Sequence, residues 1–151
     1  LLNEFEVERL LFLGDLFHSF QNNEWHLFSA WVKQQQSELI LIEGNHDVIP
    51  AWKFKQLGIT VAPNFKEDTF YFSHFPTEKK ENFVFCGHVH PGVKLRGAGL
   101  QQLKIPCFYQ SQNQLILPAF GVFTGLHILT PKEGDCVYIT SGKEVMEIDK
   151  N

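Results

Sequence analysis

The sequence lacks the features that mark membrane proteins and disulfide-rich proteins. Its 151 residues contain no apolar run near the ~18 residues that a membrane helix needs. It has only three cysteines, Cys86, Cys107 and Cys136, and no CxxC spacing. An odd number of cysteines without paired spacing is typical of free thiols in a reducing compartment. We therefore expect a cytoplasmic protein with no membrane partner.

The sequence also lacks an excess of positive charge. The formal net charge is −4 at pH 7, with 13 Lys and Arg against 17 Asp and Glu. No bulk positive field therefore predicts binding to nucleic acid. A phosphate ligand would need a local basic patch or bound cations. Repeats, low-complexity segments and long linkers are absent too, and we predict that residues 1–151 form a single domain.

The pattern of hydrophobic residues changes along the chain. Up to residue 58, continuous apolar runs at 9–15 and 38–47 alternate with helical patterns at 22–36 and 50–58. Continuous runs of this kind are typical of buried parallel strands. The rest of the chain consists of short β runs, at 59–62, 68–73, 83–86, 93–96, 103–109, 114–117, 122–129, 136–140 and 144–148. The two halves together predict an α/β fold with two packed mixed β-sheets flanked by helices.

Polar clusters stand where four of these hydrophobic runs stop. They are Gly14-Asp15 with His18, Gly44-Asn45-His46-Asp47, Ser73-His74 and Gly87-His88-Val89-His90. Sites in α/β sheets gather at the carboxyl ends of strands, and a preceding glycine permits a sharp turn. Asp, Asn and His offer oxygen and imidazole ligands without thiolate, which suits Mn²⁺, Fe²⁺, Zn²⁺ or Mg²⁺. The four loops therefore predict a metal site.

Each cluster also has a purely structural interpretation. Two histidines two residues apart are common in surface turns, and Asn45 and Asp47 are ordinary turn formers. His74 alone fits a hydrogen-bonded residue at a strand end, and His18 alone fits a solvated loop residue. The metal interpretation depends on the four clusters occurring together, with five of the seven histidines inside them.

The order GD, GNHD, single His and GHxH resembles the calcineurin-like metallophosphoesterases. This signature covers residues 14–90. The segment GDLFHS is similar to the second motif of double-strand-break repair nucleases. The chain also resembles the bacterial ligase-associated DNA damage response endonucleases over most of its length. The segments that carry this resemblance are HFP, GHVHPG, LRG, LKIPCF and LPAFGVFTG. The resemblance implies an α/β/β/α sandwich and a place in DNA repair, with a DNA ligase or helicase as partner.

The resemblance also implies a role for each motif residue. Two divalent cations are expected, with Mn²⁺ first and Fe²⁺, Zn²⁺ or Mg²⁺ as alternatives. Asp15 bridges both cations, His90 belongs to one site, and the other is completed by Asn45, His74 and His88. His46 is the catalytic histidine that does not bind metal, and Asp47 orients it. The implied reaction is hydrolysis of phosphodiester bonds in DNA by a metal-activated hydroxide.

Three further residues are candidates for binding the substrate. His18 follows the bridging Asp15 by three residues and is predicted to contact a phosphate. Lys94 and Arg96 alternate onto one face of a predicted strand, with Lys104 close by in sequence. This basic face is predicted to hold a nucleic-acid backbone, although exposed strand lysines also serve as ordinary edge protection.

One family motif is not found in the sequence. The family begins with Asp-x-His on a strand before the GD motif, and no such pair occurs in residues 1–151. We expect the pair to lie in a missing N-terminal strand and helix, ahead of Leu1, and the chain as given to be inactive. Two other functions stay open: a catalytically impaired binding module of the same fold, and a phosphatase acting on nucleotides or phosphomonoesters.

Overall fold

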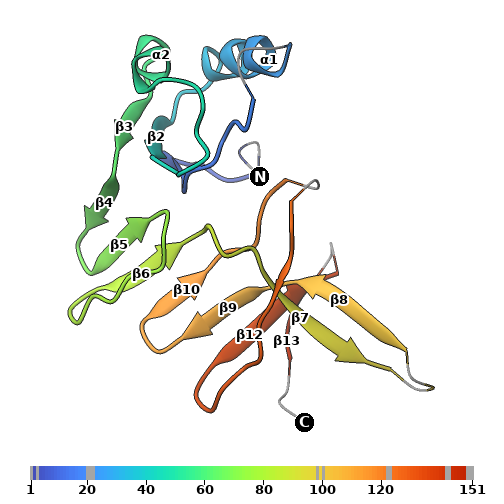
Figure 1. Cartoon of the computed structure of the whole chain (residues 1–151). Helices are drawn as coiled ribbons and strands as arrows, with labels where there is room; N and C mark the ends of the chain where they lie inside the picture. Colours follow the sequence, from blue (N-terminus) through green and yellow to red (C-terminus); the bar gives the residue numbers. More distant parts are fainter. Residues whose placement is uncertain are drawn as a thin grey trace. The chain divides into compact units, whose positions relative to one another are not determined.

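The computed structural model describes residues 2, 4–19, 23–97, 99, 101–121, 124–141 and 144–148. The chain divides into two compact units, Leu1–Phe65 and Lys66–Asn151. Helices are confined to the first unit among the described residues, and the second consists of strands (Figure 1).

The first unit is a three-stranded parallel sheet with two helices. In chain order its elements are β1 (Arg9–Phe12), α1 (Asn23–Val32), β2 (Glu38–Ile42), α2 (Ala51–Gln56) and β3 (Thr60–Ala62). The sheet order is β1-β2-β3, and both pairings are parallel. Each predicted helix and strand of this half is confirmed, although each is shorter than expected.

Aromatic side chains form the core of the first unit. Phe17, Trp25 and Phe54 are buried together with Leu39 and Leu41 of β2. The Trp25 ring lies 5.7 Å from Phe17 and 5.2 Å from Phe54. Burying each such side chain contributes about 1.5–3 kcal/mol. Phe17 belongs to the loop after β1, so this core fixes the position of a loop that carries predicted site residues.

The second unit contains two sheets. Its strands are β5 (Phe70–Ser73), β6 (Phe83–Cys86), β7 (Pro91–Arg96), β8 (Gln102–Pro106), β9 (Phe108–Ser111), β10 (Gln114–Ile116), β11 (His127–Ile128), β12 (Cys136–Thr140) and β13 (Val145–Glu147). The chain enters this unit through β4 (Asn64–Glu67). The larger sheet has the order β13-β12-β9-β10-β6-β5-β4 and the smaller one β11-β7-β8. In the larger sheet, β10 is parallel to β6 and antiparallel to β9. In the smaller sheet, β7 is parallel to β11 and antiparallel to β8, so mixed sheets are confirmed.

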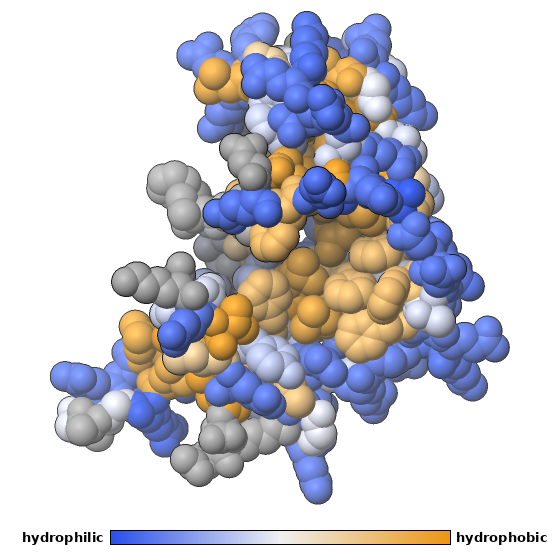
Figure 2. Space-filling model, turned by 180° about the vertical axis from the view of Figure 1, so that it is seen from behind, coloured by the Kyte–Doolittle hydropathy of each residue, from blue (hydrophilic) through white to orange (hydrophobic). Residues whose placement is uncertain are grey.

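The two sheets of the second unit share a core. Val93 of β7 is buried with Val84, Tyr109 and Val137 of the larger sheet. The opposite face of β5 and β6 carries Phe70, Phe72, Phe83 and Phe85. Phe72 and Phe85 stack with centroids 5.2 Å apart. Figure 2, which views the molecule from behind, shows hydrophobic side chains gathered over this part of the sheet.

The predicted strands of the second half differ from the observed ones in three places. The run 103–109 is two strands in two different sheets, because the chain turns at the buried Cys107. Within the run 122–129 only His127–Ile128 pairs among the described residues, and 122–123 lie outside them. β4 has no counterpart in the prediction. The predicted runs 136–140 and 144–148 are confirmed as β12 and β13, which pair antiparallel, although Gly142 and Lys143 between them lie outside the described residues.

The mixed α/β class with packed sheets and few helices is confirmed. The described residues form three sheets. All three cysteines are free. Among the described residues, no helix combines the length and the apolar character that crossing a bilayer requires.

Candidate metal centre

Asp15 lies in a tight turn directly after β1. Gly14 has φ 91° and Asp15 itself has φ 54°, a left-handed conformation that residues other than glycine seldom adopt. Gly44, at the end of the neighbouring strand, faces this turn. A Cβ atom at Gly44 would overlap the backbone nitrogen and the carboxylate of Asp15. The two glycines therefore allow the loops after β1 and β2 to approach each other.

Asp47 holds these two loops together. Its Oδ2 accepts hydrogen bonds from the backbone N–H groups of Gly44 (2.8 Å) and Asp15 (3.1 Å). Its Oδ1 accepts one from Leu16 at 2.8 Å. In return, the backbone N–H of His46 donates to Oδ1 of Asp15 at 2.9 Å. The two carboxylates thus cross-link the ends of β1 and β2, and the predicted orientation of the His46 ring by Asp47 stays a prediction.

Two exposed histidines, one in the loop after β1 and one in the loop after β2, lie beside each other. The rings of His18 and His46 stack with their centroids 5.9 Å apart and their planes at 29°. Both side chains are exposed, as is Asn45. The structure therefore brings the predicted phosphate contact next to the predicted catalytic histidine.

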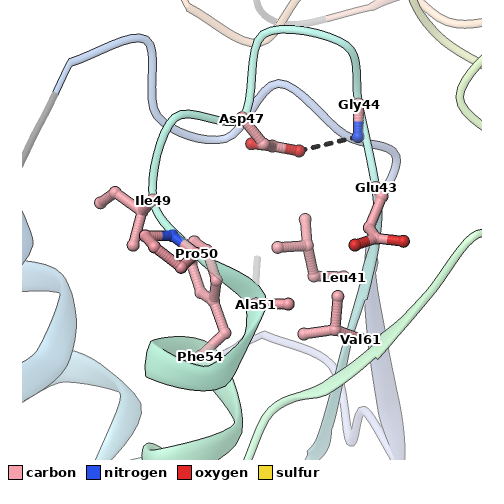
Figure 3. Close-up of a pocket in the computed structure, with 9 residues that line it drawn as sticks. All are labelled: Leu41, Glu43, Gly44, Asp47, Ile49, Pro50, Ala51, Phe54 and Val61. Atoms are coloured by element: carbon pink, nitrogen blue, oxygen red, sulfur yellow. Dashed lines mark hydrogen bonds between the residues drawn. The ribbon is translucent and has the colours of Figure 1, made fainter.

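A cavity of ≈ 240 Å³ lies between α2 and the end of β2. Figure 3 shows Phe54 of α2, Leu41 of β2 and Val61 of β3 along it, with the Asp47 carboxylate bonded to Gly44. Asp47 is the one predicted site residue in its lining. The cavity is therefore not the predicted metal site.

The histidines of the second unit meet at the carboxyl ends of two parallel strands. Ser73 of β5 pairs with Cys86 of β6, so the residues that follow them lie at one edge of the sheet. Nε2 of His74 is 3.2 Å from Nδ1 of His88. His74 is 3% exposed, whereas His88 is exposed. This meeting is what the pattern of strand ends predicts.

Backbone hydrogen bonds fix the histidine loop on both sides. The N–H of Gly87 donates to the carbonyl of His74 at 3.1 Å, and the N–H of His127 donates to the carbonyl of His90 at 2.9 Å. His88 and His90 have φ values of 62° and 51°. Both side chains are thus presented from a strained backbone, a situation that clusters at functional sites.

Phe75 lies at this site but is not among the predicted site residues. Its ring is 47% exposed and lies 4.4 Å from the His88 ring and 4.8 Å from the His74 ring. An aromatic residue directly after a predicted ligand was the available signal. Lys94 and Arg96 lie farther along β7, and both are exposed.

The family model of calcineurin-like phosphoesterases matches residues 1–113. The chain belongs to this family. The match includes all four loops described above. The crystal structure of nuclease MPE from Pseudomonas putida is also similar, with a TM-score of 0.81 and 31% sequence identity over 97% of this chain and 74% of that one. No curated protein sequence matches significantly.

As a calcineurin-like phosphoesterase, the chain is a phosphate ester hydrolase of a class that uses divalent metal ions. The described donors fit such ions. Zinc–nitrogen bonds of about 2.0–2.1 Å in a tetrahedral site place two ligand nitrogens about 3.3 Å apart, close to the His74–His88 separation. In the first unit, the carboxylate of Asp15 and the amide of Asn45 offer oxygen donors of the kind that Mn²⁺ and Mg²⁺ prefer.

Proposed function

We propose that the protein is a nuclease that hydrolyses phosphodiester bonds in DNA, of the ligase-associated DNA damage response type. The observation that carries this proposal is the His74–His88 pair, held 3.2 Å apart at a strained strand end inside a phosphoesterase family match. The similar Pseudomonas protein is named a nuclease, which supports a nucleic-acid substrate. A cytoplasmic role in DNA repair beside a DNA ligase or helicase belongs to the same proposal.

The proposed metal ligands are those that the motifs predict. Asp15 would be the ligand common to two divalent cations, with Asn45, His74 and His88 holding one of them and His90 the other. Mn²⁺ is the expected ion, with Fe²⁺, Zn²⁺ and Mg²⁺ as alternatives. When bound, such cations would supply positive charge for the phosphate and would lower the pKa of a water molecule toward neutrality.

The remaining residues act on the substrate. The backbone N–H of His46 donates to Asp15 and its ring is exposed, so the ring can protonate the leaving oxygen or stabilise negative charge on the phosphoryl oxygens. General acid catalysis of this kind contributes ~10²–10⁴-fold. His18, stacked on His46, contacts the phosphate. Asp47 preserves the loop geometry on which both histidines depend.

The test measures hydrolysis with Mn²⁺ of plasmid DNA, a chromogenic phosphodiester and a chromogenic phosphomonoester. The assay uses the protein as it occurs naturally. Cleavage of DNA and of the phosphodiester, but not of the phosphomonoester, is the expected result. His74→Gln and His46→Gln should lower the rate at least 100-fold. His26→Gln, at an exposed position of α1, is the matched control and should not.

Two other results would redirect the proposal. Hydrolysis of the monoester alone would make the protein a phosphatase. Stoichiometric Mn²⁺ binding by calorimetry without hydrolysis of any substrate would make it a binding module. Calorimetry on His74→Gln separates loss of the metal from loss of chemistry.

A further inference from the structure

Negative charge is missing from one long segment of this acidic protein. Residues 82–132 contain no Asp or Glu but include Lys94, Arg96, Lys104 and Lys132. The segment is therefore +4 in a chain of net −4, which leaves −8 for the remaining residues. Because the segment begins with β6 and the His88 loop, its positive charge lies in the unit that carries the predicted histidine ligands.

Three of these basic residues share one face of a two-stranded ribbon. β7 and β8 pair antiparallel, with Lys94 opposite Lys104 and Arg96 opposite Gln102. All four side chains are exposed. Figure 1 shows the two strands reaching out as a pair from the rest of their unit. The ribbon therefore presents a continuous basic face to solvent.

The other face of the ribbon anchors it. Val93 is buried in the core, and Leu95 and Ile105 pack against that core. At the base, the N–H of Cys107 donates to the carbonyl of Pro91 at 3.0 Å, and the N–H of Leu129 donates to that of Gly92 at 2.9 Å. The direction of the basic face is thus fixed relative to His90, the residue before β7.

The pairing of Lys94 with Lys104 is unfavourable without a counter-charge. Like charges directly opposite each other on two strands destabilise the pair. The segment itself supplies no carboxylate to offset them. A bound polyanion would remove the repulsion, whereas simple edge protection would not require two lysines facing each other.

We propose that Lys94, Arg96 and Lys104 bind the phosphate backbone of the nucleic acid on one side of the scissile bond. This inference rests on the proposed nuclease function and names a substrate-binding surface for it. At ~3.3 Å per strand residue, Lys94 lies about 13 Å and Arg96 about 20 Å beyond His90. These distances correspond to about four to six base steps of 3.4 Å. The surface therefore acts on polynucleotides and is out of reach of small phosphate esters.

The surface recognises charge and not bases. The exposed side chains of this face are two lysines, an arginine and a glutamine, with no ring on which a base could stack. Phosphate contacts position a nucleic acid without reading its sequence. The ligand is therefore a phosphodiester backbone of any sequence, in single-stranded or duplex DNA.

The experiment compares a ribbon variant with a variant of equal charge. The ribbon variant carries Lys94→Gln, Arg96→Gln and Lys104→Gln. The control carries Lys33→Gln, Lys55→Gln and Lys66→Gln, three exposed lysines outside the ribbon. Binding of labelled 30-nucleotide single-stranded and duplex DNA is measured by fluorescence anisotropy with Ca²⁺ in place of Mn²⁺, from 50 to 200 mM salt.

The ribbon variant should lower the slope of log K against log salt by about 2–3, at ~0.9 per charge for duplex and ~0.7 for single strands. Of single-stranded and duplex DNA, the form whose salt slope falls more in the ribbon variant is the form that the surface prefers. Affinity at 50 mM salt should fall about tenfold or more, whereas the control should change by less than about threefold. In the parent protein, kcat/KM should be higher for oligonucleotides longer than about six nucleotides than for the chromogenic diester. In the ribbon variant this difference should disappear.

An unchanged salt slope and an unchanged length dependence in the ribbon variant would overturn the proposal. So would an equal loss in the control, because bulk charge would then explain the binding. Failure of the nuclease function gives a different result. The parent protein would then hydrolyse no DNA, while the anisotropy measurement would still report whether the ribbon binds it.

Discussion

Replacing Asp47 by Asn tests whether this residue holds the two loops of the first unit together. The carboxylate accepts three backbone N–H groups, from Gly44, Asp15 and Leu16. Asparagine has the same shape but only one acceptor oxygen. If that oxygen takes the place of Oδ2, the hydrogen bonds from Gly44 and Asp15 are made to a neutral acceptor instead of a charged one. The amide NH₂ then faces the N–H of Leu16, so two donors oppose each other.

The magnitude follows from these three bonds. A hydrogen bond to a charged group contributes about 1.5–3 kcal/mol and a neutral one about 0.5–1.5 kcal/mol, so two bonds weaken by about 1 kcal/mol each. An opposed donor adds about 1–2 kcal/mol at this partly buried position. The total is about 3 kcal/mol. For a chain of this size, 1 kcal/mol shifts Tm by roughly 2–4 °C, so Tm should fall by about 6–12 °C.

Thermal unfolding followed by circular dichroism measures this shift, with urea unfolding as a check on the free energy. Asp68→Asn is the matched control. Asp68 is exposed in a turn with φ 50°, which asparagine adopts equally well, so its effect should stay within about 0.5 kcal/mol. A Tm for Asp47→Asn within about 2 °C of the parent protein would refute the cross-linking role.

Two further substitutions test other parts of the structure. Gly44→Ala places a Cβ against the backbone nitrogen and carboxylate of Asp15, so we expect at least about 2 kcal/mol lower stability in urea and loss of Mn²⁺-dependent hydrolysis. Gly125→Ala has open space and should be nearly neutral; equal effects would contradict the steric argument. Burial, together with the hydrogen bond to Asp135, raises the pKa of Tyr109 to about 12. An unfolded tyrosine titrates near 10, so the contribution of Tyr109 to stability should be complete below pH 10 and decline between pH 10 and about 12. Denaturant unfolding at pH 8–11.5 should show a smaller decline for Tyr109→Phe, and an identical decline would exclude this group as its source.

Much of the fold follows from local patterns in the sequence. The apolar runs of β1 and β2, the helices between them and the short strand β6 are each specified by residues within the element itself. The split of 103–109 into β8 and β9 is not. It depends on a backbone hydrogen bond from the N–H of Cys107 to the carbonyl of Pro91, sixteen residues earlier. Because Cys107 is as apolar as its neighbours, the hydrophobic pattern gives no sign of the break. β4 was missed because its sequence, Asn-Phe-Lys-Glu, carries little strand propensity.

The candidate site could be predicted in its residues but not in its geometry. The motifs indicate Asp15, His74 and His88, and parallel pairing explains why the ends of β5 and β6 meet. The three N–H partners of Asp47 come from two loops that are distant in sequence. The contact between the Phe75 and His88 rings depends on the position of the Phe75 ring after β5. Tertiary contacts of this kind leave no local periodic signal.

Backbone strain gives independent support to the ligand assignments. Among the described residues, five residues other than glycine have a positive φ, and three of them are Asp15, His88 and His90. Each such conformation costs of order 1–3 kcal/mol and persists only where surrounding bonds impose it. Glycine would adopt the same turns without that cost. The fold alone therefore gives no reason for a carboxylate and two imidazoles at these positions, whereas cations bound by these side chains would offset the cost. That argument favours an intact phosphoesterase over a binding module that has lost its metals.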